Sequence, residues 1–465
     1  MDELRPDHFE AETELEEPVD ASIDADVIDR LAAYGQAADL EPGRASEHEV
    51  EAVGLQPVEV LAVEQTGSDH ADPALSSFAP ADHVAEDEPR RFGRRRATEP
   101  KQARERRTSE KKERRAKKLV GLKIGASQIA AAQVMNNGAP ELVEAFREPL
   151  EPGLVVSGEI RDPDSLGDAL KRFFELHKLP KRVRLGVSNN RIGVRIFEIG
   201  GVADEQQLEN AIRFRAEEVL PIPLDQAVLD YVVLDEQERE DGTVWKRILL
   251  VVAYREVVDR YLQACRRAGL QVVGIDLEAF ALLRSLEAPA VRDEASGALV
   301  AVAIGHDRTT IAVSTGLHCE FARVLDWGGW SLNVAIAREL DRAPSEVESI
   351  KRHLSFAHGT EIDGLDIDQV TKSRDGIQRA LAAFARELIA SLQFYQAQPG
   401  ALGIGEVVLT GGTAHMDGFV DAVGELVGVP VRLGDPFRRV KVGPNVGHDG
   451  QHGSLAIAIG LGIED

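Results

Sequence analysis

LVGLKIGASQIAAAQV at residues 119–134 and LVAVAIGHDRTTIAVS at residues 299–314 are two versions of one pattern. Each is an apolar strand that ends in Ile-Gly, followed by a few small or polar residues and a second strand. Each therefore predicts a β-hairpin that turns at Gly125 or Gly305. Backbone N–H groups at tight turns gather anionic oxygens, and glycine lets a phosphate approach closely. Two such hairpins, one opening each half of the chain, predict a nucleotide held between two lobes.

A third glycine turn ends a strand near the C-terminus, in LTGGT at residues 409–413. Outward from these turns the pattern is α/β. LGDALKRFFELHKL at 166–179 has the apolar spacing of an amphipathic helix, and QRALAAFARELIASLQFYQAQ at 378–398 predicts a long helix. AVLDYVVLDEQ and VWKRILLVVAY, at 227–237 and 244–254, predict another hairpin.

Charge divides the chain of 465 residues, whose net charge is −25, into three segments. Residues 1–89 hold 25 acidic and 3 basic residues, a net of −22. This polar segment cannot bury enough apolar surface to offset its ordering entropy, so we expect a disordered tail. Residues 90–118 hold 15 basic and 4 acidic residues, a net of +11. The folded part is expected from residue 119 onward.

The composition argues against several classes of protein. The negative balance argues against nucleic acid as the main partner, because phosphate binding needs clustered cations. The two cysteines, Cys265 and Cys319, exclude a disulfide framework. No apolar stretch approaches the roughly 18–20 residues that cross a bilayer. We expect a cytoplasmic protein without a metal site.

The basic segment 90–118 has two interpretations. It is either a solvated linker whose cations offset the acidic tail, or a contact with anionic lipid headgroups at a membrane surface. Nucleic acid binding ranks third, because Phe92 is the one aromatic residue in the segment.

The order of hairpin, hairpin and LTGG turn resembles the phosphate and adenosine motifs shared by actin, heat-shock ATPases and sugar kinases. More narrowly, residues 119–465 resemble the PilM family of actin-like proteins of type IV pilus assembly. The segments that carry this resemblance include VGLKIGASQIAAAQV, AEEVLPIPLDQAVLDY, RYLQACRRAGLQVVGIDLEAF and VVLTGGTAHMDGFVDAV. It implies a two-lobe actin-like α/β fold with a small α+β subdomain inserted in the first lobe. It is also compatible with a homo-oligomer.

The resemblance also implies a division of the chain. We expect an acidic disordered tail at 1–89, a basic linker at 90–118, the first part of lobe 1 at 119–190, the inserted subdomain at 191–255, a return to lobe 1 at 256–297, and lobe 2 with a closing helix at 298–465.

A nucleotide site follows from the same resemblance, with ATP or ADP as the expected ligand. The implied binding residues are Lys123, Gly125, Ala126, Ser127, Gln128, Gly305, Thr309, Thr310, Glu348, Lys351, Arg352, Ser355, Gly411, Gly412 and Thr413. The superfamily has Asp two residues before the glycine of each phosphate turn, and these carboxylates hold Mg²⁺. Here the two positions are Lys123 and Ala303, so we do not expect the usual Asp pair to hold a metal.

Lys123 therefore has two interpretations. Its ammonium either replaces part of the metal's charge at the phosphates, or pairs with a local carboxylate in a degenerate cleft. The resemblance places Glu278 where a water-positioning carboxylate would lie, although a glutamate at the start of a helix is commonly a cap or surface charge. We expect weak hydrolysis or none.

In the PilM family the groove beside the inserted subdomain holds the cytoplasmic N-terminus of PilN, a membrane-anchored partner. The implied groove residues are Ile192, Val194, Ile196, Leu208, Ile212 and Phe214. The alternative is that these residues form the subdomain's own core. We therefore expect a scaffold at the cytoplasmic face of the inner membrane. The alternative functions are a filament-forming division protein of the FtsA kind and a kinase of the same superfold.

Overall fold

The computed structural model describes residues 118–464, apart from residues 203, 220–221, 240, 358–360, 445 and 448–451. The predicted acidic tail 1–89 and almost all of the basic linker 90–118 lie outside the described residues. None of the described helices combines the length and the apolar character that crossing a membrane requires.

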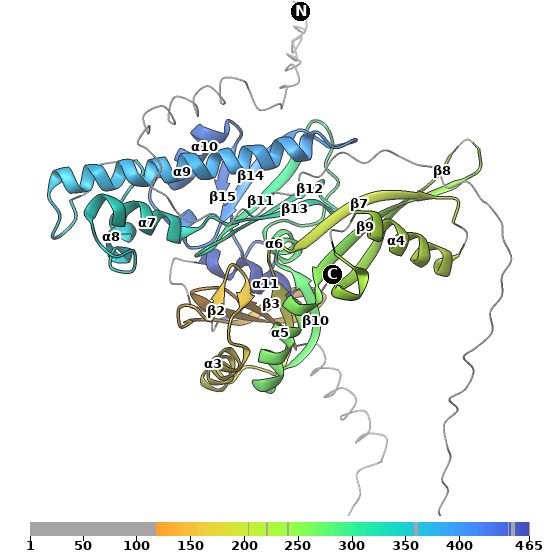
Figure 1. The fold of residues 1–465 in the computed structure, drawn as a ribbon, viewed down its shortest axis with the longest axis horizontal. Helices are drawn as coiled ribbons and strands as arrows, with labels where there is room; N and C mark the ends of the chain where they lie inside the picture. Colours follow the sequence, from red (N-terminus) through yellow and green to blue (C-terminus); the bar gives the residue numbers. More distant parts are fainter. Residues whose placement is uncertain are drawn as a thin grey trace, which may run out of the picture.

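The first large sheet begins with the hairpin predicted at residues 119–134. Its six strands lie in the order β10-β6-β1-β2-β3-β16, with β1, β2 and β3 antiparallel and β6 and β10 parallel to β1. Helices α3 and α5 cover one face with their apolar stripes (Figure 1). The bounds are β1 Lys118–Ile124, β2 Gln128–Asn137, β3 Ala139–Pro149, β6 Arg182–Val187, β10 Gln271–Leu277, β16 Lys441–Val442, α3 Pro163–Leu176 and α5 Arg255–Arg267.

The second large sheet repeats the opening of the first. Its order is β13-β12-β11-β14-β15. Strands β11 and β12 are the hairpin predicted at residues 299–314, and β13 extends it to an antiparallel meander. The long helix α9 crosses one face of this sheet, next to α7 and α10 (Figure 1). The bounds are β11 Ala298–Ile304, β12 Thr309–Ser314, β13 Cys319–Leu325, β14 Ile404–Thr410, β15 Val431–Leu433, α7 Gly329–Leu340, α8 Glu348–His353, α9 Ile367–Gln396 and α10 Phe419–Val427.

A smaller subdomain lies between β6 and α5. Its three strands, in the order β7-β9-β8, carry helix α4 on one face and extend to one side of the two large sheets (Figure 1). Asp204 caps α4, since its Oδ1 accepts a hydrogen bond from the Gln207 N–H at 2.8 Å. The bounds are β7 Ile192–Gly200, α4 Glu205–Val219, β8 Ala227–Glu238 and β9 Val244–Tyr254, preceded in the chain by the short hairpin β4 Val155–Val156 and β5 Glu159–Ile160.

Two helices, α6 Glu278–Leu286 and α11 Ala456–Gly462, lie between the large sheets. Glycines let them come very close. A Cβ on Gly460 would lie 1.7 Å from the Ala281 carbonyl oxygen, and one on Gly121 of β1 would lie 2.0 Å from the Ala458 carbonyl oxygen. Backbone therefore packs on backbone where the chain's last helix meets the first lobe.

Segment 298–465, expected to hold lobe 2 and a closing helix, also contributes to the first sheet. Segment 298–465 does not form lobe 2 alone, because β16 pairs with β3 and α11 packs on β1 and β2 of the first sheet. No local sequence pattern indicates this, since both elements are held in place by contacts with residues far away in the chain.

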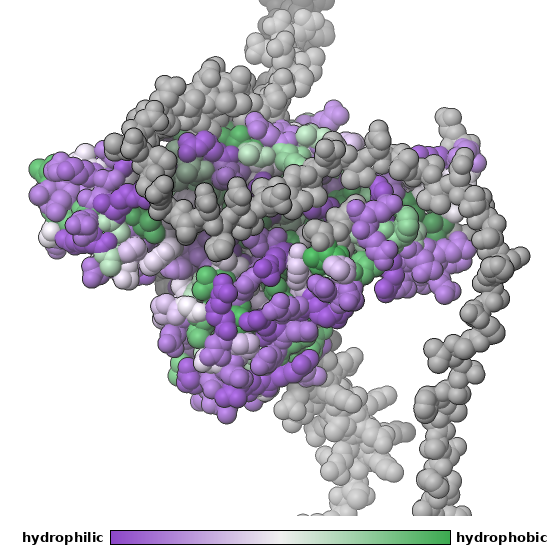
Figure 2. Space-filling model, viewed as in Figure 1, coloured by the Kyte–Doolittle hydropathy of each residue, from purple (hydrophilic) through white to green (hydrophobic). Residues whose placement is uncertain are grey.

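The surface shown in Figure 2 is mainly hydrophilic, with small separate apolar areas. The exposed large apolar side chains are spread over several elements, as is ordinary for a protein surface. Both cysteines are buried. Burial raises the pKa of Cys265 and of Cys319 to about 12, so both thiols are protonated at neutral pH.

We predict that Gly460→Ala destabilises the protein. Alanine is favoured over glycine in a helix by about 1 kcal/mol, but the new methyl group would overlap the Ala281 carbonyl. We expect the free energy of unfolding to fall by about 2 kcal/mol in a denaturant titration. Gly447→Ala, where a Cβ meets nothing within 4 Å, is the control. A Gly460→Ala protein as stable as the wild type would show that this contact does not limit the fold.

Candidate functional site

The three predicted glycine turns meet at one cavity of about 190 Å³ between the two large sheets. Residues of β1, β2, β11, α8 and the end of β14 line it. The predicted binding residues among them are Lys123, Ser127, Gln128, Gly305, Glu348, Lys351, Arg352, Gly411, Gly412 and Thr413.

The two hairpin turns are built in the same way. The Gly125 N–H donates to the Gln128 carbonyl at 2.9 Å, and the Gly305 N–H donates to the Arg308 carbonyl at 2.8 Å. Gly125 and Ala126 form the first turn but do not line the cavity. At the third turn Gly411 has φ +96°, and a Cβ there would lie 2.1 Å from the Ile304 carbonyl oxygen. Only glycine fits this approach of β14 to β11.

Lys123 lies at the cavity wall, two residues before Gly125. Its ammonium is 3.5 Å from Oε2 of Glu278, the first residue of α6, and the two side chains are 17% and 6% exposed. The equivalent position on β11 is Ala303. The Glu278 carboxylate is thus the counter-charge of the Lys123 ammonium, on the side of Lys123 away from the cavity.

Helix α8 brings three charged side chains to the opposite wall. The Glu348 carboxylate accepts from Lys351 at 2.8 Å, from Asn333 at 2.9 Å and from Arg352 at 3.0 Å. Burial alone would raise the pKa of Glu348, but these hydrogen bonds and the charge of Lys351 hold it below its ordinary value. The carboxylate therefore stays ionised and fixes both cations at the cavity.

Three predicted residues point elsewhere. Thr309 Oγ1 donates to the Trp327 carbonyl at 2.8 Å, and Thr310 Oγ1 lies 3.1 Å from Ser188 Oγ. Ser355 Oγ donates to the Asp417 carboxylate at 2.5 Å. All three are buried and bonded within the protein, so the structure does not bring them to the cavity wall.

Other lining residues were not predicted. Arg147 comes from β3, a strand that was not predicted from the sequence, and Ser454 comes from the C-terminal segment. His306 directly follows Gly305, and that adjacency was a usable signal. Burial and the nearby Lys351 lower the pKa of His306 against the opposing charge of Asp307, so the ring is neutral at pH 7.

The lobes are joined directly beside the cavity. The Ser157 N–H donates to Asp307 Oδ2 at 2.9 Å, and the Arg308 guanidinium donates to the Ser188 carbonyl. Arg308 is only 9% exposed. The turn after Gly305 in the second lobe is thereby tied to the β4–β5 hairpin of the first.

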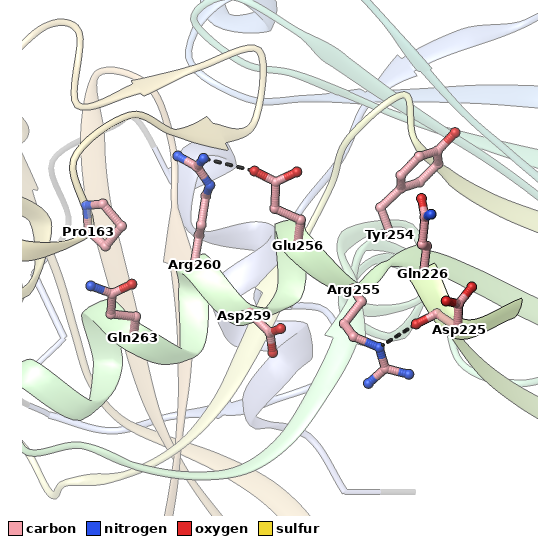
Figure 3. Close-up of a pocket in the computed structure, with 9 residues that line it drawn as sticks. All are labelled: Pro163, Asp225, Gln226, Tyr254, Arg255, Glu256, Asp259, Arg260 and Gln263. Atoms are coloured by element: carbon pink, nitrogen blue, oxygen red, sulfur yellow. Dashed lines mark hydrogen bonds and ion pairs between the residues drawn. The ribbon is translucent and has the colours of Figure 1, made fainter. Parts of the chain in front are cut away.

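A second, larger hollow of about 710 Å³ lies where the inserted subdomain meets α5 (Figure 3). We call it the subdomain groove. Its walls come from η1 Leu224–Gln226 and the end of β9, from the first turns of α5, and from the start of α3. The lining residues are Pro163, Asp225, Gln226, Tyr254, Arg255, Glu256, Asp259, Arg260 and Gln263.

The β4–β5 hairpin also contacts this groove. The Arg260 guanidinium donates to the Ile160 carbonyl at 3.1 Å, and Tyr261 OH donates to the Gly158 carbonyl at 3.2 Å. Gly158 has φ +70°, and a Cβ there would lie 1.9 Å from Arg308 Nη1. One short hairpin therefore contacts both the subdomain groove and the residues that follow the second phosphate turn.

The residues predicted to line a partner groove lie mainly in cores. Leu208 and Ile212 are 5% and 2% exposed between α4 and the three-stranded sheet, and Val194 is 9% exposed in the core of the first lobe. Ile192 and Ile196 pack against that same core. Phe214, at 63% exposure, is the one of the six on the surface. The resemblance implied a partner groove at these residues, but five of the six pack in or against the protein's own cores.

Residues 121–465 match the family of the type IV pilus assembly protein PilM. The chain belongs to this family.

Known structures and sequences agree with that assignment. A solved PilM-PilN type IV pilus biogenesis complex is 26% identical to this PilM-family protein, with a TM-score of 0.62 over 74% of this chain and 97% of that chain. The cell division protein FtsA of Pseudomonas aeruginosa is 27% identical over 363 residues, 69% of this chain and 84% of its own. MreB5 of Spiroplasma citri bound to ADP is more distant, at 14% identity and a TM-score of 0.42 over 74% of this chain and 95% of that chain.

The fold is therefore the two-lobe actin-like ATPase fold expected from the sequence, with the added subdomain. The family match decides for pilus assembly, and the distant FtsA relation does not favour a role in division.

The residues of this PilM-family protein do not fit the Mg²⁺ that its fold implies. Mg²⁺ takes oxygen ligands, and in nucleotide sites these are usually one or two carboxylates together with phosphates and waters. Lys123 and Ala303 stand at the two positions where the carboxylates would be, and Glu278 is paired with Lys123. The part of the chain that the structure describes contains no group of three or more His, Cys, Asp or Glu side chains able to hold a metal ion.

We predict that Glu348 contributes to stability in a pH-dependent way. Because folding lowers its pKa from the ordinary value of 4.5, this contribution is present above pH 4.5 and is lost as the pH falls through the folded-state pKa. Glu348→Gln should melt below the wild type at pH 7, and the two melting temperatures should converge on acidification. The exposed Glu425→Gln is the control. Wild-type and Glu348→Gln curves that stay parallel from pH 7 to the acid limit would contradict this role.

Proposed function

We propose that this protein is a scaffold of type IV pilus assembly at the cytoplasmic face of the inner membrane. In this proposal the subdomain groove binds the N-terminal cytoplasmic peptide of a PilN-like membrane protein, and the cleft between the lobes binds ATP or ADP with little or no hydrolysis. The observation that carries the first part is the groove itself, the larger hollow described above, beside the subdomain that distinguishes this fold.

The similarity to a solved PilM-PilN complex supports a PilN-like partner. A membrane-anchored protein with a short cytoplasmic terminus would present an extended segment to a scaffold. An extended peptide binds best along a sheet edge or a groove, where main-chain contacts give affinity and side-chain pockets give specificity. Residues that line the subdomain groove follow the first turns of α5, from Arg255 to Gln263 (Figure 3).

The charges of the groove favour a cationic peptide. Arg255 donates to the carbonyls of Asp225 and Ala227 at 3.0 and 2.9 Å, and Arg260 donates to Glu256 at 2.8 Å, so both guanidinium groups are engaged within the protein. Among the described residues, the exposed carboxylates of Asp225 and Asp259 have no side-chain partner. Such carboxylates pair well with an α-amino group or a basic side chain near a peptide's N-terminus.

Tyr254 supplies an apolar surface at one end of the groove. Its ring is half-buried, with the Arg191 guanidinium 5.5 Å from the ring centroid. Arg191 in turn pairs with Glu159 of β5 at 3.4 Å. The contact with Arg191 holds the Tyr254 ring in place. An apolar ring at this position suits a peptide with an apolar residue beside its charged terminus.

The cleft supports the nucleotide part of the proposal. Glycine turns from both lobes converge on it, and its walls carry the cations Lys123, Arg147, Lys351 and Arg352 against the single carboxylate of Glu348. Such a cavity attracts a polyanion. Among the described residues that line the cleft, Glu348 is the one carboxylate, and it is bonded to Lys351, Asn333 and Arg352, which supports little or no hydrolysis.

We predict that Asp259→Lys weakens peptide binding at least tenfold, because it replaces an attractive charge with a repulsive one. The measurement is fluorescence anisotropy of the full-length chain with labelled N-terminal peptides of membrane proteins encoded beside it. Glu425→Lys, the same charge change on the surface of α10, is the control and should bind as the wild type does. Equal loss in both variants would indicate a general charge effect, and no binding of any candidate peptide to the wild type would overturn the groove assignment.

A further inference from the structure

The position that decides the chemistry of the cleft is Lys123. It stands on β1 two residues before Gly125, and the matching turn bonds at Gly125 and Gly305 make Ala303 its counterpart on β11. One strand end therefore supplies a cation and the other supplies a methyl group, at the two places nearest to where the turns would receive phosphates.

The environment of Lys123 keeps this cation at the cavity. Glu278 lies 3.5 Å behind it and is nearly fully buried, so the ammonium is neither free to swing out to solvent nor unpaired. An ammonium has three N–H donors. Pairing with one carboxylate oxygen leaves donors for an anionic oxygen in the cavity, which Lys123 also lines.

A divalent cation has no place in this arrangement. An ion among the phosphates would lie against the Lys123 ammonium, and the nearest carboxylate is already neutralised by that ammonium. Ser127 and Gln128 offer only neutral oxygens at the first turn. Two weak neutral ligands beside a fixed positive charge do not compete with water for Mg²⁺.

We infer that this cleft binds its nucleotide as the metal-free anion, with the Lys123 ammonium, held by Glu278, in the place of Mg²⁺. The inference rests on the nucleotide part of the proposed function and deepens it. The ligand class is a nucleoside di- or triphosphate whose charge is met by protein cations alone.

The test is isothermal titration calorimetry of the full-length chain with ADP and ATP, each in excess Mg²⁺ and in excess EDTA. We expect affinities that differ by less than about threefold between the two buffers. The key variant is Lys123→Met combined with Glu278→Gln, which preserves shape and removes both charges without leaving one buried and unpaired. It should keep the wild-type melting temperature and lose roughly ten- to a hundredfold in affinity, the weight of one charge-assisted hydrogen bond.

A matched control changes a cation away from the cleft. Lys372→Met on α9, whose ammonium pairs with Asp368 at 2.7 Å on the surface, should bind nucleotide as the wild type does. A second variant, Lys123→Asp with Ala303→Asp, should show binding that EDTA weakens at least tenfold, because it restores a carboxylate at each strand end.

The outcomes are separable. If Mg²⁺ tightens nucleotide binding to the wild type tenfold or more, the inference is overturned and the nucleotide proposal stands. The same holds if the double variant Lys123→Met, Glu278→Gln binds nucleotide as the wild type does. No binding in either buffer would overturn the inference and the nucleotide proposal together. The peptide assay on the same sample would still report on the groove independently.

Discussion

The close packing of α6 and α11 between the two large sheets is the constraint on which this structure depends. Gly460 lets α11 contact the backbone of α6, and Gly121 lets β1 contact the backbone of α11. Apolar residues of both helices form one core with β11 and β14, which belong to the second lobe. Since the glycine turns sit at the strand ends beside these helices, the spacing of the helices determines how far apart the two phosphate turns lie.

The two candidate sites are built from different elements around this frame. The cleft takes its cations from β1, β3 and α8, and the subdomain groove takes its walls from α3, α5 and the inserted sheet. The β4–β5 hairpin lies between them: its Ser157 N–H donates to Asp307, which follows the second phosphate turn, and its Ile160 carbonyl accepts from Arg260 of the subdomain groove. One short segment is therefore hydrogen-bonded both to the subdomain groove and to the residues next to the cleft.

Local sequence patterns predicted the hairpins and the cleft between the lobes. They did not predict features that depend on contacts between residues far apart in the chain. The paired Ile-Gly turns predicted both hairpins, their convergence and the position of Lys123, because a strand followed by a glycine turn is specified within a dozen residues. Thr309, Thr310 and Ser355 were assigned to the site by resemblance, but each is bonded inside the protein. Leu208 and Ile212, which are buried in the subdomain's own core, show a limit of apolar patterns: an apolar face indicates burial and does not say whether the chain itself or a partner covers it. No sequence pattern marks Asp225 and Asp259, which come to line the same groove only when the chain folds.

The short strand β16 has a consequence for how the protein is made. Lys441 pairs with Glu141 of β3, so the first sheet receives its outermost strand from a segment 300 residues later in the chain. Helix α11, which covers the other face of that sheet, comes later still. While the ribosome is still producing the second half, the first half has an open edge and a bare apolar face, so it can complete its core only after the last residues emerge. A chain that stops short of its final twenty-five residues would lack parts of both lobes, not just a tail.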